Sequence, residues 1–507
     1  MQKKESQAMT SSVDVDVPLL EDRPSSSSDV DLVDESSVTT VAKQPNKKIP
    51  VAVFFIIATE ICERFSYYGL KAILALYLRN VRDFDADGAT TVVHTFVMLA
   101  YAMTLFGGWL SDSFLGKFRT VVYLSLVYVL GGALLSITAT PELDGGRAGV
   151  FISLLLIAIG TGGIKPVVSS FLGEQFGADQ GELITKVFMY FYFAINLGSV
   201  GSTLITPAIR SNWSYAAAFG LPAALLFIAT MIFILGRSRY KQQPPAGSVV
   251  SRSLKAIGVA LYRTVRKPAG APRVDHWLER ARDRFSAPII GDLRSALRAA
   301  SIFLPMPAFW ALFDQHASRF IFQAQRMDLT VFGAPIDADQ VPFLNPLIVL
   351  LLIPVFDFLI YPGLRRLRVN FSPLRRIGVG MLFASSSFAA ASILESFIDS
   401  QPDGTVNIAW QLPQYILLTI GEVLISITGL EFAYTQSPAS LKALVSALWQ
   451  LTVAGGNLIV IMVASSRLLE QVYEYAMFAG LMLLSLAVHI FLARRYEYVA
   501  NTPPNVD

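Results

Sequence analysis

The sequence predicts an all-α membrane protein with twelve transmembrane helices in two six-helix bundles. Of its 507 residues, 53% are hydrophobic and only 16% are charged, whereas a soluble domain carries roughly 25% charged residues. The mean hydropathy is +0.51. Long apolar runs, such as Val51 to Leu78 and Val150 to Leu172, supply the roughly 20 helical residues that cross a bilayer. We therefore expect an integral multi-pass protein that has the lipid bilayer as its solvent.

The order of the apolar runs divides the chain into two halves. The expected spans are 50–78, 90–111, 118–138, 149–172, 184–207, 215–236, 300–325, 343–364, 374–397, 411–434, 441–466 and 472–494. A long basic connection with an amphipathic stretch at 276–285 follows the sixth span, and such a division is typical of transporters with a substrate path between two bundles. The expected regions are a disordered tail (1–48), a first bundle (49–236), a linker (237–299), a second bundle (300–495) and a second tail (496–507).

The distribution of basic residues predicts the orientation. They gather before the first expected span and after the second, eighth and twelfth spans, at Lys43, Lys47, Lys48, Lys117, Arg119, Arg365, Arg366, Arg368, Arg375, Arg376, Arg494 and Arg495. With an even number of spans, all these positions lie on one side. The positive-inside rule places that side in the cytoplasm, so both tails and the linker are expected to be cytoplasmic.

Several functional classes are disfavoured. A formal net charge of +3 is too small to indicate nucleic acid as a partner, and the single cysteine, Cys62, excludes an intrachain disulfide and a cysteine-ligated metal site. The sequence contains no phosphate-binding loop, nucleophile elbow or metal-ligand cluster. The glycines at 160–163 lie in an apolar run, where small residues permit close helix packing. We therefore expect no enzyme activity, no cofactor and no metal.

Charged residues interrupt the first apolar run. Lipid exposure of each would cost about 2.5–3.5 kcal/mol on insertion scales. At helical spacing the polar residues of this run fall on one stripe, formed by Glu60, Glu63, Arg64, Tyr67, Tyr68 and Lys71. One face of the helix is therefore expected to look into a polar interior. Structural ion pairs between helices are the alternative interpretation, and the complete stripe favours function.

Other expected spans also carry polar residues: His94, Tyr101, Lys165, Tyr192, Asn196, Asp314, Asn345 and Glu422. The cations of the first half, Lys71 and Lys165, are matched in number by Asp314 and Glu422 in the second half. Ion pairs between the halves would break when the path opens. A carboxylate that loses its cationic partner in a dry interior takes up a proton more readily, which links helix movement to protonation.

The segment Glu60 to Gly69, EICERFSYYG, resembles the ExxERFxYYG signature of the proton-dependent oligopeptide transporter family, a branch of the major facilitator superfamily. Further segments that resemble the family are Gly107–Val121, Gly160–Phe171, Phe191–Ser199, Phe309–Gln315 and Gly421–Pro438. The resemblance extends from about residue 50 to residue 495 and is closest to animal-type di- and tripeptide transporters. It implies the major facilitator fold and the import of di- and tripeptides by alternating access, with protons as the coupling ion.

The resemblance also implies roles for individual residues. Together with the charge pattern, it assigns proton coupling to Glu60, Glu63, His94, Asp314 and Glu422. It assigns substrate binding to Arg64, Tyr68, Lys71, Tyr101, Lys165, Tyr192, Asn196, Trp310, Asn345, Glu422 and Trp449. The cations would hold the peptide carboxylate, while Glu422 and the two asparagines would hold its ammonium group. The family also implies a pair between Lys165 and Glu422.

The sequence departs from the family pattern in two places. Lys71 stands where many members have arginine, so it keeps the charge but not the bidentate fork. The connection from about Phe397 to Trp410 is short where vertebrate members carry a large extracellular domain. The alternatives are nitrate, histidine or another small metabolite as substrate, and a sensor or scaffold with a transporter fold. The plasma membrane is favoured over a lysosomal or vacuolar membrane. His316 has no assigned role.

Overall fold

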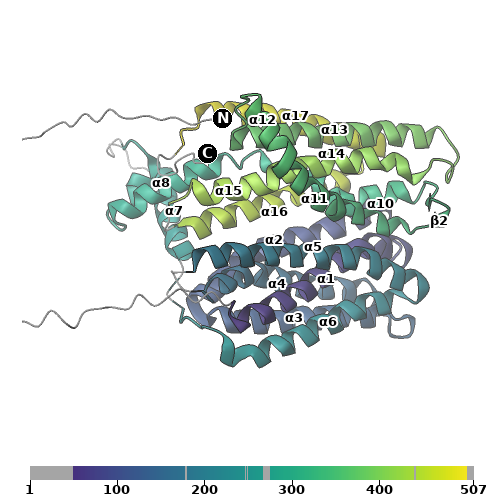
Figure 1. Cartoon of the computed structure of the whole chain (residues 1–507), viewed down its shortest axis with the longest axis horizontal. Coiled ribbons are helices and arrows are strands. Elements are labelled where there is room, and N and C mark those ends of the chain that lie inside the picture. Colours follow the sequence, from purple (N-terminus) through teal and green to yellow (C-terminus); the bar gives the residue numbers. More distant parts are fainter. Residues whose placement is uncertain are drawn as a thin grey trace, which may run out of the picture. The chain divides into compact units, whose positions relative to one another are not determined.

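The computed structural model describes residues 49–176, 180–245, 247, 249–266, 274–438 and 441–498. The tail predicted at 1–48 lies outside these residues, as does most of the tail predicted at 496–507. The described residues belong to one compact unit, Lys47–Asp507. Within that unit, Figure 1 shows two groups of helices lying side by side, one coloured purple to teal and the other green to yellow.

The first bundle contains six helices. They are α1 (Val51–Asn80), α2 (Ala86–Leu110), α3 (Lys117–Thr138), α4 (Gly146–Gly173), α5 (Gly181–Asn212) and α6 (Tyr215–Leu235). A π-helical turn, Ser111–Leu115, extends α2, and 3-10 turns occur at Pro141–Leu143 and Gly236–Arg239. Helix α1 packs between α5 and α6, and α4 packs against α2 and α3.

Glycines explain the close approach of α2 and α4. A Cβ atom added to Gly107 would lie 2.0 Å from the carbonyl oxygen of Gly163, and one added to Gly162 would lie 2.0 Å from that of Ala100. Both separations are too short for a real side chain. The prediction that the glycines at 160–163 serve helix packing is therefore confirmed.

The second bundle contains several interrupted spans. Its helices are α9 (Met306–Phe313), α10 (Arg319–Ala324), α11 (Leu344–Val355), α12 (Tyr361–Arg366), α13 (Pro373–Asp399), α14 (Leu412–Glu422), α15 (Thr428–Thr435), α16 (Lys442–Ser466) and α17 (Gln471–Arg495). A 3-10 turn at Asp314–Ala317 separates α9 from α10, and π-helical turns at Phe356–Ile360 and Val423–Ile427 join α11 to α12 and α14 to α15. Further 3-10 turns lie at Ala338–Phe343 and Ile408–Gln411. Strands β1 (Thr330–Val331) and β2 (Ala334–Pro335) pair antiparallel, with Thr330 opposite Pro335.

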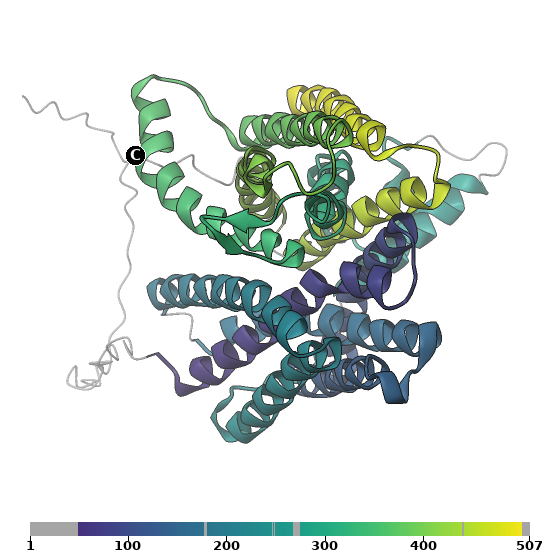
Figure 2. The ribbon, with the colours of Figure 1, turned by 90° about the vertical axis from the view of Figure 1, so that its right-hand side faces the viewer.

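The number of apolar helices agrees with the predicted twelve spans once α1 is considered. Among the described residues, ten helices are long and apolar enough to cross a membrane, and the bent pair Ala287–Ser301 and Met306–Ala324 brings the number to eleven. Helix α1 lies outside this count because every 18-residue stretch of it holds more than two charged residues. It is nevertheless 30 residues long and lies among the other helices of the first bundle in both views (Figures 1 and 2).

The seventh span differs from the prediction. The sequence predicted one continuous helix over 300–325, whereas the backbone leaves helical geometry at Ser318, where φ is −141° and ψ is −81°. The polar sequence Asp314-Gln315-His316 favours this break because its side chains bond to nearby backbone and to other helices. The break brings polar groups to the centre of the molecule.

The connection between the bundles forms helices outside the predicted amphipathic stretch. They are α7 (Val249–Val265) and α8 (Ala287–Ser301). Residues 276–285 contain only a 3-10 turn, Trp277–Ala281, in which Leu278 and Ala281 are buried. The stretch was too short for a stable helix of its own, whereas α7 covers more than four turns and buries Ser253, Ala256 and Ala260 along one face.

Candidate functional site

A cavity of about 340 Å³ lies between the two bundles. Its walls come from α1, α2, α4 and α5 on one side and from α9, α11, α14, α15 and α16 on the other. Most of the predicted site residues line it: Tyr68, Lys71, Tyr101, Lys165, Tyr192, Asn196, Trp310, Asp314, Asn345, Glu422 and Trp449. Residues separated by hundreds of positions in the sequence are thereby brought together at one site.

The remaining charges of α1 form a buried network beside the cavity. Nε of Arg64 lies 3.0 Å from Oε1 of Glu60, and the same guanidinium also contacts the carboxylate of Glu63. The hydroxyl of Thr161 on α4 donates to Glu63 at 2.7 Å. All three charged residues are buried. The predicted polar face of α1 is thus confirmed, but Arg64 does not line the cavity because two carboxylates hold it.

Lys71 and Asp314 connect the bundles across the cavity. Nζ of Lys71 lies 2.5 Å from Oδ1 of Asp314, and both side chains are buried. Nδ2 of Asn457 on α16 donates to the other carboxylate oxygen at 2.7 Å. The predicted balance between a cation of the first half and an anion of the second is confirmed here. Removing one member of a buried pair costs about 3–5 kcal/mol because the other charge is left unpaired.

Lys165 and Glu422 do not form the pair that the resemblance implied. Among the described residues, the ion pairs include none between them, although both line the cavity. Nζ of Lys165 lies 3.8 Å from the ring centroid of Tyr101, a cation-π contact. Oε2 of Glu422 accepts a hydrogen bond of 2.6 Å from Asn345. Each charge has a local partner on its own side of the open cavity, so the prediction of a direct pair is wrong for this conformation.

His94 belongs to a polar layer next to the cavity rather than to its lining. Nδ1 lies 2.7 Å from Oδ1 of Asn457, and Nε2 lies 2.9 Å from Oγ of Ser318. Because Asn457 also bonds Asp314, a continuous chain runs from His94 through the amide to the Lys71–Asp314 pair. Asn457 and Ser318 were not predicted from the sequence. The available signal for Asn457 was its amide inside the apolar run 441–466, which holds one other amide, that of Gln450.

Aromatic side chains form the apolar part of the cavity wall. The rings of Trp310 and Trp449 lie 6.1 Å apart and meet at 74°. Gly429 makes room for one indole, since a Cβ atom there would lie 2.1 Å from Cη2 of Trp449. Apolar contact with large rings accepts side chains of many shapes. Gly429 was not identified from sequence, because its role depends on a helix that lies beside it only in the fold.

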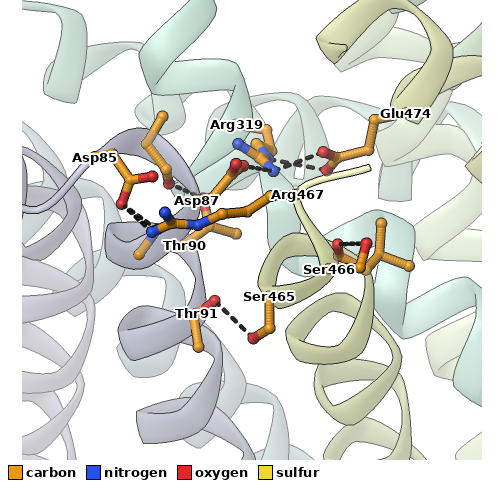
Figure 3. A network of polar contacts seen from close by, with 12 residues as sticks. Asp85, Asp87, Thr90, Thr91, Arg319, Ser465, Ser466, Arg467 and Glu474 are labelled. Carbon is orange, nitrogen blue, oxygen red and sulfur yellow. Dashed lines mark hydrogen bonds and ion pairs between the residues drawn. The ribbon is translucent and has the colours of Figure 1, made fainter. Parts of the chain in front are cut away.

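One end of the space between the bundles is closed by ion pairs, and we call it the sealed end (Figure 3). Arg319, at the start of α10, is 2% exposed and binds Glu474 of α17 through two bonds, of 2.9 and 2.6 Å. The same guanidinium reaches Asp87 of α2, in the other bundle, at 2.7 Å. Nearby, Arg467 contacts Asp85 at 2.8 Å.

A second set of contacts closes the same space at another point. Arg210 of α5 donates to both oxygens of Asp339, at 3.1 and 2.5 Å, and lies 3.3 Å from Asp337. These contacts were not predicted from the sequence. The arginines lie near helix ends, where a charged residue is common and gives no specific signal.

The opposite end is open, and we call it the open end. A second cavity of about 460 Å³ lies there and shares Lys165, Leu430 and Gln450 with the central cavity. Its lining includes Asp112, whose carbonyl oxygen accepts from the backbone N–H of Gly247 in the connection that leads to α7. The open end therefore lies on the side of α7 and α8, towards the left of Figure 1.

The described residues contain no group of three or more His, Cys, Asp or Glu side chains that is arranged to hold a metal ion. The central cavity instead presents two cations and two carboxylates, among tyrosines, asparagines and tryptophans. Such a lining suits a ligand that carries both charges.

Comparison with known proteins gives consistent results. The model of the POT family matches residues 118–492. Solute carrier family 15 member 2 of Rattus norvegicus is 31% identical over an alignment of 657 residues, which covers 89% of this chain and 90% of the relative. That alignment is longer than the 507 residues of this chain, so the relative carries additional segments. This agrees with the short connection noted at 397–410.

Solved structures show the same architecture. The crystal structure of the POT family transporter PepTSo is 34% identical, with a TM-score of 0.78, and the match covers 89% of this chain and 99% of that one. A peptide transporter POT crystallised in complex with alafosfalin is 25% identical, with a TM-score of 0.70, over 88% of this chain and 95% of that one. The predicted major facilitator fold is thereby confirmed.

Proposed function

The chain belongs to the POT family of transporters, and we propose that it is a proton-coupled symporter that imports di- and tripeptides by alternating access. The observation that carries this proposal is the arrangement of charge in the central cavity. Lys165 lies on the wall of the first bundle, and Glu422 lies on that of the second, hydrogen-bonded to Asn345. Since the two are not paired with each other, a zwitterion has a partner for each of its ends.

The carboxylate end of the peptide is assigned to Lys165, with Lys71 nearby. The ammonium end is assigned to Glu422 with Asn345 and Asn196. Asn196 donates to the backbone oxygen of Tyr192 at 2.9 Å, which leaves its amide oxygen to accept from the substrate. A cavity of about 340 Å³ lies within the range of roughly 300–1,000 Å³ that is usual for small-molecule sites.

The tryptophans account for broad selectivity. Trp310 and Trp449 offer apolar faces, and side-chain binding by contact area discriminates weakly between shapes. The charged ends, in contrast, are common to all unmodified peptides. This division of roles permits one site to accept many sequences while it rejects molecules that carry a single charge.

Proton coupling is assigned to the carboxylates that connect the bundles and to those of α1. Asp314 is held by Lys71, and Glu60 and Glu63 are held by Arg64. When the bundles separate at the sealed end, the Lys71–Asp314 pair is broken and a proton replaces the cation. Asn457 bonds both Asp314 and His94, so a change in the charge of Asp314 is transmitted to the imidazole through these two hydrogen bonds.

The conformation and orientation fit an importer that faces inward. Basic residues flank the open end, so the positive-inside rule places it and both termini in the cytoplasm. The sealed end then faces outside, and the plasma membrane is the proposed location. Each proton that enters across 100 mV contributes about 2.3 kcal/mol. Inward transport driven by an acidic, positive exterior follows.

The test of the substrate class is a competition assay. Proteoliposomes that contain the protein are given labelled di-alanine together with excess unlabelled di-alanine, nitrate or histidine. The proposal predicts competition by di-alanine alone. Glu422→Gln removes the anionic partner of the ammonium and is expected to lower uptake at least tenfold, because a buried charge–charge contact contributes more than about 1.4 kcal/mol. Competition by nitrate, with uptake unchanged in Glu422→Gln, would contradict a zwitterionic substrate.

A further inference from the structure

His316 lies at the break in the seventh span and faces the central cavity. It belongs to the 3-10 turn Asp314–Ala317 between α9 and α10. The turn directs Asp314 and His316 to the same cavity wall. The imidazole is buried, and its ring packs 4.8 Å from that of Phe313, centroid to centroid. Its orientation is therefore fixed by the fold.

The contacts of His316 determine which nitrogen carries the proton. Nδ1 lies 2.6 Å from the backbone oxygen of Phe313. A carbonyl oxygen can only accept, so Nδ1 must donate. In the neutral ring Nε2 then has a lone pair and no proton. Among the described residues, no hydrogen bond to Nε2 occurs, and the residue lines the cavity. The wall therefore presents an acceptor that has no protein partner.

The substrate supplies few groups that match this acceptor. A site that binds many peptides relies on groups common to all of them, which are the two charged ends and the peptide bond. The ammonium is already assigned to Glu422 and Asn345, and the carboxylate cannot donate. The remaining donor is the N–H of the peptide bond, which lies between the two ends that the cavity holds on opposite walls.

We propose that Nε2 of His316 accepts a hydrogen bond from the peptide-bond N–H of the bound substrate. This inference rests on the proposed function and adds a recognition element to the same site. His316 contacts the substrate backbone between its ammonium and carboxylate ends. It therefore favours a peptide over a zwitterion of equal length that lacks an amide N–H. Fixing the ring in advance makes the bond more favourable, because no rotamer freedom is lost when the substrate binds.

The experiment compares two substrates that differ at this donor, where a methyl group replaces the amide hydrogen. The KM for uptake into proteoliposomes is measured for alanyl-alanine and for alanyl-N-methylalanine. In the wild type, methylation is expected to raise KM about fivefold, the factor for one neutral hydrogen bond of about 1 kcal/mol. In His316→Leu, the ratio of the two KM values is expected to fall to about one. The ratio does not depend on how much folded protein is present.

Further variants separate hydrogen bonding from packing. His316→Gln places an amide oxygen near the position of Nε2 and is expected to retain the preference, whereas His316→Asn is too short and is expected to lose it. His489→Gln is the control, because that buried histidine bonds the backbone oxygen of Leu374 on α13 and does not line the cavity. It is expected to keep the wild-type ratio.

Three outcomes overturn the inference, and the measurements distinguish them. A wild-type ratio near one, or a ratio that persists in His316→Leu, shows that the amide N–H is not read by this residue, while peptide uptake and the proposed function stand. A steric penalty from another wall produces the persistent ratio. Absence of alanyl-alanine uptake in the wild type instead overturns the proposed function together with the inference.

Discussion

The two ends of the space between the bundles are built from different interactions. At the sealed end, arginines on one bundle meet aspartates on the other, as with Arg319 and Asp87. At the open end, the second cavity is lined by Asp112, Lys117 and Lys165 among apolar and small polar residues. It continues into the central cavity, where the Lys71–Asp314 pair joins the bundles. When the bundles separate, water can replace the ion pairs that join them. The end that holds these ion pairs is therefore the end that is closed in this conformation.

The comparison also shows that burial distinguishes the ion pairs at the sealed end. Arg319 is held by Glu474 of its own bundle, so its guanidinium stays fixed when Asp87 moves away. Arg467 and Asp85, in contrast, are both exposed. Exposed pairs contribute about 0–1 kcal/mol, whereas a buried partner that is lost leaves an uncompensated charge. The buried pairs are therefore expected to control closure.

The largest effect, on acid-driven dipeptide uptake, is expected from Asp314→Asn. This change leaves Lys71 buried without its anion, at a cost of about 3–5 kcal/mol. We expect acid-driven uptake of dipeptide to fall at least 100-fold, as measured in proteoliposomes. The exchanged variant Lys71→Asp with Asp314→Lys restores a pair and is expected to recover part of the activity. Full activity in Asp314→Asn alone would show that the pair has no role in the cycle.

A smaller effect is expected when the sealed end is weakened by Asp87→Asn. Arg319 keeps Glu474 but loses its partner in the first bundle. With about 1–2 kcal/mol removed from closure, the population open to the outside is expected to rise about tenfold. The measurement is the rate at which an impermeant maleimide labels Ser199→Cys, a cavity position, in a Cys62→Ser background. An unchanged labelling rate would contradict a gating role for Arg319.

On the cavity side, Gly429→Ala tests the aromatic wall. Its Cβ atom would lie 2.1 Å from Trp449, so the indole must move into the cavity. Overpacking costs about 1–3 kcal/mol, and we expect KM to rise several-fold more for a tryptophan-containing dipeptide than for di-alanine. Gly480→Ala is the matched control, since a Cβ atom there meets nothing within 4 Å. Equal KM changes for both peptides would argue against a role of this wall in selectivity.

The smallest effect, on the rate of maleimide labelling of the cavity, is expected from Asp85→Asn. Its partner Arg467 is exposed and lies at the same sealed end as Arg319. Because the pair is solvated, the maleimide labelling rate is expected to change less than about threefold. A change as large as that of Asp87→Asn would show that burial does not separate the two pairs.

Much of the fold was predictable, because lipid exposure imposes a long apolar run on nearly every span. The exceptions have physical causes. The polar residues at 314–316 favour the break at Ser318, but its position also depends on bonds from the seventh span to other helices, which a local pattern does not show. Similarly, residues 276–285 look amphipathic, but they are too few to form a helix there.

The sequence predicted which residues form the site better than it predicted which of them contact each other. Polar residues in apolar runs identified Lys165, Glu422 and Asp314, because burying a charge is costly and requires a reason. Which charges meet depends on the conformation. Arg64 is held by Glu60 and Glu63 beside the cavity, and Lys165 rests on Tyr101 rather than on Glu422. The arginines of the sealed end gave no signal, since charged residues near helix ends are common.

The most direct test of the account is coupled transport in proteoliposomes. Labelled di-alanine is added outside the vesicles. An acidic exterior and a negative interior are imposed, first separately and then together. Uptake is followed under each condition with and without a protonophore. The account predicts accumulation above the external concentration under either gradient, more under both, and its collapse with the protonophore. Uptake that is indifferent to both pH and potential would contradict proton-coupled import.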